Sequence, residues 1–389
     1  MDFDQLIDRR GTKSSKWDNV VNLYDVTAEG CLPMWVADTD FRAPDFVQDA
    51  LKALWDHGVY AYQADYSDYT GAITWWMAHR HGWEIEPSWI HTTTGVVNGI
   101  AMCIETFSQP GDGVVTFTPV YHAFARVIKS AGRRVVECPL AIEDGLHKID
   151  FEDAQSRLSG DESILFLCSP HNPGGRVWTR DELEGVAEFA RRNDLILVSD
   201  EIHHDLVFEG HNHIPMAHID GILDRLVMLT AVSKTFNLAG HHTGNAIIPD
   251  PALNAKFTAR MKALSIEKNL MGVAAATAAY SPAGAEWVDA FVAYLDGNRK
   301  IFDAGLNAIP GVRSMPLQST FLSWVDFSGT GMSPAEIHAR VEKTANIAAN
   351  HGHTFGTGGE TWLRFNFGTQ RARIEEAVAR MQDAFSDLQ

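Results

Sequence analysis

Cysteine is scarce in this chain. Its 389 residues contain four cysteines, Cys31, Cys103, Cys138 and Cys168, with at least 30 positions between neighbours and no C-x-x-C pair. Such spacing is typical neither of a disulfide framework nor of a zinc site. We therefore expect four free or buried thiols in a reducing compartment.

Long apolar runs are also missing. The longest ones, such as Ile164–Cys168 and Leu195–Val198, have the length of a core strand and are much too short to cross a bilayer. The opening residues, MDFDQLIDRRGTKSSKWD, carry acids throughout and no apolar stretch, so they do not predict a signal peptide. We expect a cytoplasmic protein with no membrane partner.

Positive charge is in deficit. Lysine and arginine number 32 against 50 aspartates and glutamates, a formal net charge of −18. Because nucleic acids and anionic membranes require a basic surface, we expect neither as a partner. The 31 glycines and 15 prolines are too few for a fibrous or low-complexity chain, and 45% hydrophobic residues are ordinary for a soluble globular enzyme. The length suggests two or three domains, or one large core with a smaller lobe.

Between about residues 90 and 250 the sequence alternates short apolar runs with amphipathic runs. Helical spacing covers Tyr121–Ala131 and Arg180–Asn193, and Thr179 precedes the second as a helix-start signal. Apolar strands separated by helices predict an α/β fold with a mostly parallel central sheet flanked by helices. The predicted strands are GVVTF (113–117), RVVEC (134–138), ILFLC (164–168), LILVS (195–199), LVMLT (226–230) and NAIIP (245–249).

The last third has a different pattern, which predicts a smaller α+β domain. Helices are expected over 251–308, 334–343 and 370–388, with strands over 321–325 and 362–367. We divide the chain into an N-terminal segment joining the small domain (1–45), a large cofactor-binding domain (46–283) and a small C-terminal domain (284–389).

Three polar loops follow core strands directly: SPHNPGG (169–175), SDEIHHDL (199–206) and SKTFNLAG (233–240). Because the carboxyl ends of parallel strands open onto one edge of a sheet, these loops should bring Asn172, Asp200 and Lys234 together. A lysine close behind an apolar strand should be buried. Burial lowers its pKa and makes its amine a usable nucleophile for a Schiff base.

Pyridoxal phosphate is the cofactor that needs this set of groups. It requires a lysine amine, a carboxylate for its ring nitrogen and donors for its phosphate. The segment TTTGVVNGI (92–100) supplies donors, since a turn at Gly95 opens a helix whose free N–H groups can bind phosphate. The ring of Tyr121, behind the GVVTF strand, can stack on the cofactor ring.

In this order, the motifs resemble the fold-type I aminotransferase superfamily over essentially the whole chain. Further segments are similar to its cystathionine β-lyase, or carbon–sulfur lyase, branch: FDQLIDRRGTKSSKWD, LPMWVADTDF, HGVYAYQ, the His-His pair after SDEI, and WLRFNFGTQR. The resemblance implies a homodimeric enzyme with shared active sites. It favours β-elimination from a sulfur amino acid to give pyruvate, ammonia and a thiol.

The resemblance also implies roles for single residues. Lys234 would bind the cofactor covalently and serve as the catalytic base, Asp200 would pair with the ring nitrogen, and Tyr62 would reach the neighbouring subunit's phosphate. Arg364 would bind the substrate carboxylate. The implied cofactor-binding residues are Gly95, Val96, Val97, Tyr121, Asn172, Asp200, His203, Ser233, Lys234, His242 and Tyr62, and the substrate-binding residues are Arg364, Ala37 and Asn172.

One position departs from the family pattern. Many members place an arginine eight residues after the cofactor lysine, where it binds the phosphate, and this chain has His242 there, preceded by His241. A neutral imidazole offers one donor where a guanidinium offers a fork. Phosphate binding should therefore depend more on other groups.

Other functions compete with this interpretation. Transamination would use the same residues, so an aminotransferase is the alternative within the enzyme class. A metal-dependent hydrolase is a more distant one, because histidines crowd beside carboxylates and zinc accepts both as ligands. No H-E-x-x-H is present, so we expect no metal. A cofactor-binding regulator on the same fold is the third alternative. The crowded residues are His203, His204, His211, His213 and His218, beside Asp200, Glu201 and Asp205.

Overall fold

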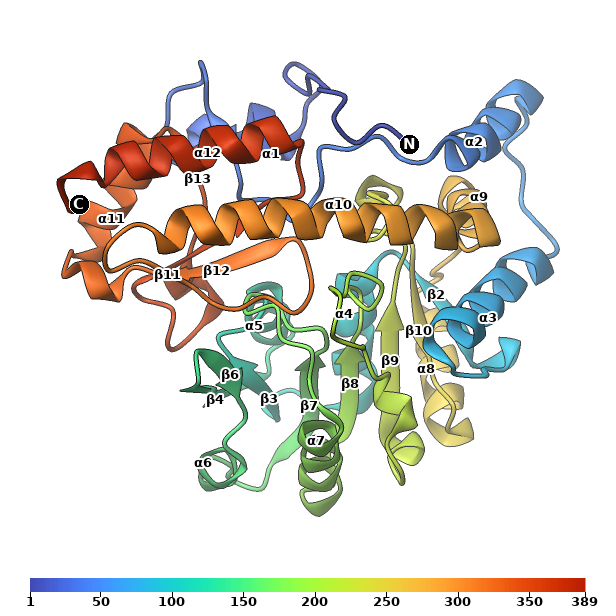
Figure 1. Cartoon of the computed structure of the whole chain (residues 1–389). Coiled ribbons are helices and arrows are strands. Elements are labelled where there is room, and N and C mark those ends of the chain that lie inside the picture. Colours follow the sequence, from blue (N-terminus) through green and yellow to red (C-terminus); the bar gives the residue numbers. More distant parts are fainter. Residues whose placement is uncertain (389) are drawn as a thin grey trace.

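The computed structural model describes residues 1–388 and centres on a seven-stranded sheet (Figure 1). The strand order is β2-β10-β9-β8-β7-β3-β4. Strand β10 runs antiparallel to both of its neighbours, and every other pair in this sheet is parallel. The predicted α/β fold with a mostly parallel sheet is thus confirmed. The strands are β2 Ile90–Thr93, β3 Gly113–Thr118, β4 Arg134–Pro139, β7 Glu162–Cys168, β8 Ile196–Asp200, β9 Leu226–Thr230 and β10 Gly244–Ile247.

Helices cover both faces of this sheet, which is why its strands are apolar throughout. Along β7, Ile164 and Phe166 enter the core that α4, α5 and α8 share. The intervening Leu165 and Leu167 enter the core on the other face, with α3, α7 and α10. These helices are α3 Ser67–His81, α4 Val96–Phe107, α5 Ala123–Ser130, α7 Arg180–Arg192, α8 Pro251–Ala263 and α10 Pro282–Asn307.

Helix α7 begins where its sequence predicts. The Thr179 side chain accepts the Glu182 backbone N–H at 3.3 Å, and the Glu182 carboxylate accepts the Thr179 N–H at 2.8 Å. This reciprocal capping box satisfies two donors that a helix start leaves free. Helix α5, in contrast, begins at Ala123 rather than at the predicted Tyr121, because Tyr121 and His122 belong to the turn that leaves β3.

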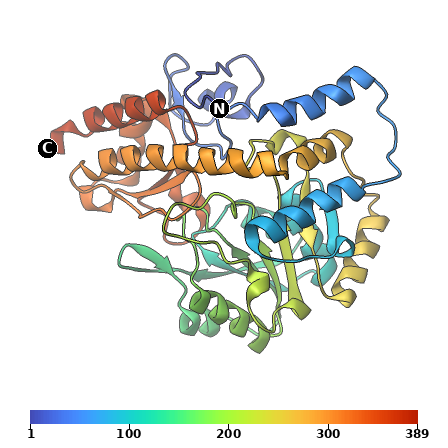
Figure 2. The same cartoon turned by 45° about the vertical axis from the view of Figure 1, so that its right-hand side comes forward.

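The last third forms a second, antiparallel sheet of order β11-β12-β15-β14. Helix α10 lies along this region, and α12 packs against α10 (Figures 1 and 2). The predicted helix over 334–343 is α-helical only to Ala339 and continues as a π-helix over Arg340–Thr344. The elements are β11 Arg313–Ser314, β12 Leu322–Asp326, α11 Pro334–Ala339, β13 Ile347–Ala348, β14 Asn350–His351, β15 Trp362–Asn366 and α12 Arg371–Ala384.

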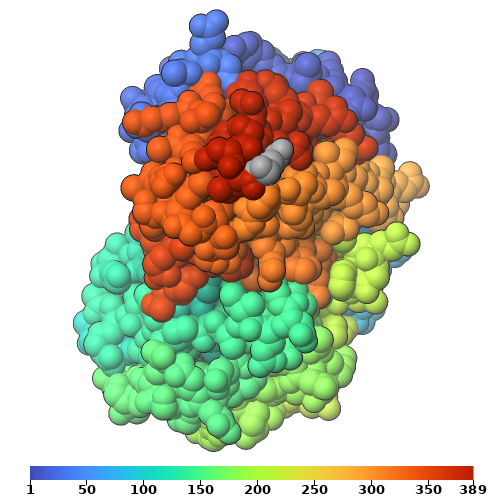
Figure 3. Space-filling model, turned by 60° about the vertical axis from the view of Figure 1, so that its left-hand side comes forward, coloured from blue at the N-terminus to red at the C-terminus, as the bar shows by residue number. Residues whose placement is uncertain are grey.

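The N-terminal segment lies against this last third. Strand β1, Leu32–Pro33, pairs in parallel with β13. Figure 3 shows the C-terminal third and the N-terminal segment together, above the part of the chain that carries the large sheet. The three-part domain division with boundaries at 45 and 283 remains a prediction.

Some elements give no clear sequence signal. They are α1 Ser15–Asp18, α2 Asp45–His57, α3, β2, the hairpin β5 Ala141–Glu143 with β6 Leu146–Lys148, and α6 Phe151–Ser156. Helix α9 Leu270–Ala279 lies within the region 251–308 that the sequence predicts to be helical. Helix α2 packs on α9, and the loop after it runs along the outside of the molecule (Figures 1 and 2). All four cysteines are buried and free. Within residues 1–388, no helix combines the length and the apolar character that a membrane span requires.

Candidate active site

A cavity of about 300 Å³ opens where β7, β8 and β9 end and the three predicted loops begin. It gathers Asn172, Asp200 and Lys234, as the parallel topology predicts. Its lining residues are Ala37, Thr94, Gly95, Val96, Val97, Tyr121, Cys168, Asn172, Asp200, Ile202, His203, Ser233, Lys234, Ala239 and His242.

Lys234 lies on the loop after β9 and faces the N-terminal segment. Its Nζ donates a hydrogen bond to the Ala37 carbonyl oxygen at 2.7 Å. Burial lowers the pKa of Lys234 to about 8, and the positive charge of Arg364 acts in the same direction. Because a free lysine has a pKa near 10.4, a far larger share of this amine is uncharged at neutral pH. The side chain can therefore act as a nucleophile or a base.

Asp200 is the last residue of β8 and is buried. Its carboxylate accepts the backbone N–H of Ile202 at 3.2 Å. Burial raises the pKa of Asp200 to about 7, although the charge of Lys234 acts in the opposite direction. Because burial disfavours the charged form of this carboxylate, it ionises most readily beside a cation, such as a protonated ring nitrogen.

The start of α4 forms another wall of the cavity. Gly95 precedes the helix with φ 97°, a conformation that favours glycine, and no side chain caps the helix start. The backbone N–H groups of Val96 and Val97 have no partner within the helix, so they can bind an anion. Strand β10 packs tightly here, since a Cβ on Gly244 would lie 2.9 Å from the Gly95 carbonyl carbon.

Arg364 lies on β15 and reaches the cavity through Asn172. Its Nη1 donates to the Asn172 side-chain oxygen at 3.0 Å, and its Nη2 donates to the Trp35 carbonyl oxygen at 2.8 Å. Nη2 also donates to Asn350 on the neighbouring strand β14. Burial lowers the pKa of Arg364 to about 10, so the guanidinium remains charged at neutral pH. Its Nε has no partner among residues 1–388, which leaves one buried donor for a ligand.

His203 and Cys168 complete the buried wall. Burial and the charges of Lys234 and Arg364 keep the pKa of His203 well below its usual range, and its Nδ1 has no partner within the described chain. A neutral imidazole with a free ring nitrogen can serve a polar ligand atom. Burial raises the pKa of the Cys168 thiol, which accepts the Asn172 N–H at 3.3 Å. Cys168 therefore remains a protonated thiol, which is a poor nucleophile.

Three predicted site residues lie outside this cavity or are exposed at it, and one of them, Arg364, does not line it but hydrogen-bonds the lining residue Asn172. Tyr62 lies on the loop after α2, fully exposed and not among the residues that line the cavity. His242 lines the cavity, but its side chain is exposed and its φ of 48° is left-handed. Sequence reasoning missed Thr94, Cys168, Ile202 and Ala239. Thr94, Ile202 and Ala239 lie inside segments that the sequence singled out, and Cys168 ends the predicted strand 164–168, so these positions were the available signal.

The crowded histidines do not gather around one point. His203 faces the cavity, whereas His213 lies 2.7 Å from Glu201. Within residues 1–388, one cluster has the spacing of metal ligands, and it joins His204 and Asp205 to His81 of α3.

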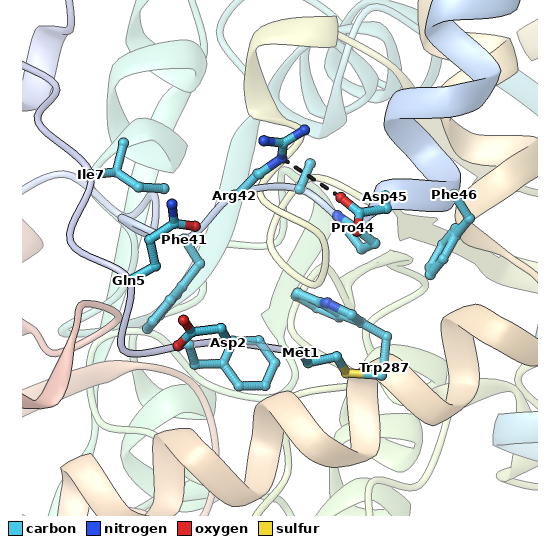
Figure 4. Close-up of a pocket in the computed structure, with 12 residues that line it drawn as sticks. Met1, Asp2, Gln5, Ile7, Phe41, Arg42, Pro44, Asp45, Phe46 and Trp287 are labelled. Atoms are coloured by element: carbon cyan, nitrogen blue, oxygen red, sulfur yellow. Dashed lines mark ion pairs between the residues drawn. The ribbon is translucent and has the colours of Figure 1, made fainter.

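A second hollow, of about 450 Å³, lies beneath the N-terminal residues (Figure 4). Its walls include the rings of Phe3, Phe41 and Trp287, and Phe3 stands edge-on to both of the others. Arg42 and Asp45 form an exposed ion pair at its rim, 3.8 Å apart. None of its lining residues belongs to the predicted site, so the smaller cavity is the candidate active site.

The cavity fits pyridoxal phosphate in four respects. It offers an amine of lowered pKa, a buried carboxylate for a ring nitrogen, an uncapped helix start for a phosphate and the ring of Tyr121 as a stacking surface. These groups come from separate loops around a single space. Their individual roles remain predictions.

The chain is similar in sequence and structure to known proteins. The family model for aminotransferase class I and II matches residues 45–381. Cystathionine beta-lyase PatB of Bacillus subtilis (strain 168) is 40% identical, over 99% of this chain and 100% of its own length. Protein MalY of Escherichia coli (strain K12) is 31% identical over 98% of each chain. The crystal structure of cystalysin from Treponema denticola, which contains a pyridoxal 5'-phosphate cofactor, is 34% identical with a TM-score of 0.94. That match covers 100% of this chain and 99% of the other.

Proposed function

The chain belongs to the aminotransferase class I and II family, and on that premise we propose that it is a pyridoxal-phosphate-dependent carbon–sulfur β-lyase of the cystathionine β-lyase type. It cleaves a sulfur amino acid to pyruvate, ammonia and a thiol. The observation that carries this proposal is the 40% identity to a cystathionine β-lyase along the whole chain, together with the lysine, carboxylate and helix start around one cavity.

Bound pyridoxal phosphate supplies an electron sink for negative charge that develops at Cα of an amino acid. Lys234 would hold this cofactor covalently, and its Nζ, when free, would accept the Cα proton of the substrate. The lowered pKa of Lys234 increases the fraction of this amine that carries a free electron pair near neutral pH. The Ala37 carbonyl oxygen orients the amine from the N-terminal side.

Asp200 would provide the negative charge that keeps the cofactor's ring nitrogen protonated. Its burial strengthens this interaction, because low polarity favours a close ion pair over two separated charges. Tyr121 would stack on the cofactor ring, and Asn172 and His203 would donate to its polar substituents. Gly95, Val96 and Val97 would present the helix start to the phosphate, together with Ser233 and His242, which line the same cavity.

Arg364 binds the substrate carboxylate. Its charge is buried, and its Nε is a donor without a partner among the described residues. Asn172 touches both this guanidinium and the cavity, so it fixes the angle between the carboxylate site and the amine. Ala37 lines the same cavity and would form part of the substrate wall.

The active enzyme is a homodimer in the cytoplasm. Helix α2 and the loop after it expose apolar side chains that a single chain leaves open to water: Trp55, Val59, Tyr60 and Tyr62. An exposed apolar patch of this kind is typical of a subunit interface. Tyr62 would contribute its hydroxyl to the partner's phosphate site, and four free thiols suit a reducing compartment.

Product analysis tests this function against an aminotransferase. The purified enzyme with pyridoxal phosphate is incubated with L-cystathionine, and pyruvate and free thiol are assayed without and then with a keto acid. A lyase forms both products without the keto acid. An aminotransferase would release neither pyruvate nor thiol and, only when the keto acid is present, would convert cystathionine to its keto acid and the added keto acid to an amino acid; that result would establish the aminotransferase, which the family also includes.

A further inference from the structure

Asp205 is a buried carboxylate that the mechanism above does not use. It lies in the turn after β8, five positions beyond Asp200, and its side chain is completely buried. A buried ion is costly unless hydrogen bonds compensate for the lost water. The groups around Asp205 therefore indicate what it stabilises.

Both carboxylate oxygens are surrounded by donors. Oδ1 accepts the Trp76 indole N–H at 3.0 Å and lies 3.0 Å from His81 Nε2. Oδ2 accepts the Thr235 hydroxyl at 2.8 Å and lies 3.3 Å from His204 Nε2. The imidazoles of His204 and His81 hold the pKa of Asp205 well below its usual range, so the group is an anion at neutral pH.

Both imidazole rings lie against this anion, and the His81 ring hydrogen-bonds to it, whereas His204 Nε2 lies 3.3 Å from Oδ2 without making a hydrogen bond within the described chain. His81 and His204 stack with centroids 4.1 Å apart and planes at 19°. Burial lowers the pKa of His81 to about 4, so its ring is neutral and presents a single N–H. Arg80 adds a charge at 3.8 Å on the solvent side.

These contacts join three parts of the active site region. Asp205 follows the strand that carries Asp200, Thr235 directly follows Lys234, and Trp76 and His81 belong to α3. The hydrogen bond from Thr235 is a side-chain link from the lysine loop to the rest of the structure, and Thr235 is completely buried. Movement of this residue would move Lys234 with it.

We propose that Asp205 is a positioning residue that, through the Thr235 hydroxyl, fixes the backbone of Lys234 and so holds its amine against the Ala37 carbonyl oxygen. The role of Lys234 rests on the proposed function. The structural link does not. Small displacements of a reacting group cost much of the rate, about a hundredfold for 1 Å.

The test compares two buried threonines on the same stretch of chain. Thr235→Val removes the hydroxyl that binds Asp205 and preserves the size of the side chain. Thr230→Val removes a buried hydroxyl with no partner within the described residues, at the end of β9, and is the matched control. Thr235→Ser restores the hydroxyl and serves as the rescue.

Two measurements are made on each variant. One is kcat and KM for pyruvate release from cystathionine by the holoenzyme. The other is the pH dependence of acetylation of Lys234 by acetic anhydride in the cofactor-free protein, followed by mass spectrometry of the peptide that contains it. The second reports the pKa of this amine without any need for turnover.

We expect Thr235→Val to lower kcat about ten- to a hundredfold with little change in KM. We also expect the acetylation midpoint to rise from about 8 toward the value of a free lysine. Thr230→Val should match wild type and Thr235→Ser should approach it. Equal effects of Thr235→Val and Thr230→Val, or no effect of Thr235→Val on either measurement, would overturn the proposal.

Asp205→Asn provides a second single variant. Together with Thr235→Val and the double variant it forms a double-mutant cycle. If the two groups act through one hydrogen bond, the double variant should be no slower than the worse single variant. Multiplied losses would contradict the link. If wild type itself releases no pyruvate, the proposed function fails, and the acetylation midpoints still decide the role of Asp205.

Discussion

Lys234 and Asp200 line one cavity, yet burial shifts their pKa values in opposite directions, because it disfavours the charged form of each. Both side chains therefore have neutral forms in reach at physiological pH. A cofactor with a protonated ring nitrogen would lower the pKa of Asp200 again, because its positive charge stabilises the carboxylate. The cofactor-free protein should consequently show a distinctive dependence of stability on pH.

We predict that Asp200→Asn stabilises the cofactor-free protein at pH 8 and loses this advantage toward pH 4. The folded-state pKa of Asp200 is raised from 3.8 to about 7, so wild type is most stable below the unfolded value and loses stability as pH rises through 7. The gain at pH 8 should be on the order of 4 kcal/mol. Thermal or urea unfolding at both pH values measures it. A pH-independent difference between the two proteins would contradict the assignment.

Arg364 gives a prediction about binding. Arg364→Lys should raise KM for every amino-acid substrate, because an ammonium cannot present the planar fork that a carboxylate accepts. The expected loss is about 1.5–3 kcal/mol, or roughly ten- to a hundredfold in KM. Steady-state kinetics with cystathionine checks this. An unchanged KM would move the carboxylate site elsewhere, and a fall in kcat alone would point to an effect on Lys234.

The sequence predicts some helices and strands more clearly than others. Strands β7, β8 and β9 were predictable because each is an uninterrupted apolar run, and their loops could be placed because parallel strands end at one edge. The direction of β10 was not, since an apolar run carries no information on whether its neighbour is antiparallel. Helix α3 was not predicted because Trp75 and Ala78 place apolar side chains outside the buried face of Tyr69, Ile73 and Trp76, which weakens the amphipathic pattern.

Contacts between distant segments could not be predicted from the sequence either. Arg364 was predicted from its motif, but its hydrogen bond to Asn172 joins residues 192 positions apart. The bond from Lys234 to Ala37 crosses 197 positions, and it depends on how the N-terminal segment folds over the sheet edge. Motifs identify such side chains, whereas packing decides which of them meet.

The capping box of α7 offers a test of a single helix. Thr179→Ala should destabilise the protein by about 1 kcal/mol, because it leaves backbone donors at the helix start without a partner. Glu188→Gln, on the exposed side of the same helix, is the control and should cost no more than about 0.5 kcal/mol. Urea denaturation measures both. Equal effects would mean that the cap contributes nothing beyond local charge.

We expect the active molecule to be a homodimer, because Tyr62 is exposed in a single chain and the family resemblance implies that it reaches the partner's active site. Lys234→Ala and Tyr62→Ala should each be impaired, for different reasons. After the two are mixed and their subunits exchanged, a heterodimer holds both defects in one site and leaves the other intact. Pyruvate release should therefore recover in part. Absence of recovery after proven exchange would show that Tyr62 does not act across the interface.

The central claim is that the amine of Lys234 carries pyridoxal phosphate and performs the chemistry. Reduction of the holoenzyme with borohydride, followed by digestion and mass spectrometry, locates the attached cofactor. The account predicts the label on the peptide containing Lys234, with loss of activity in proportion to labelling, and no label in Lys234→Ala. A label on another lysine, or full activity in the labelled protein, would contradict it.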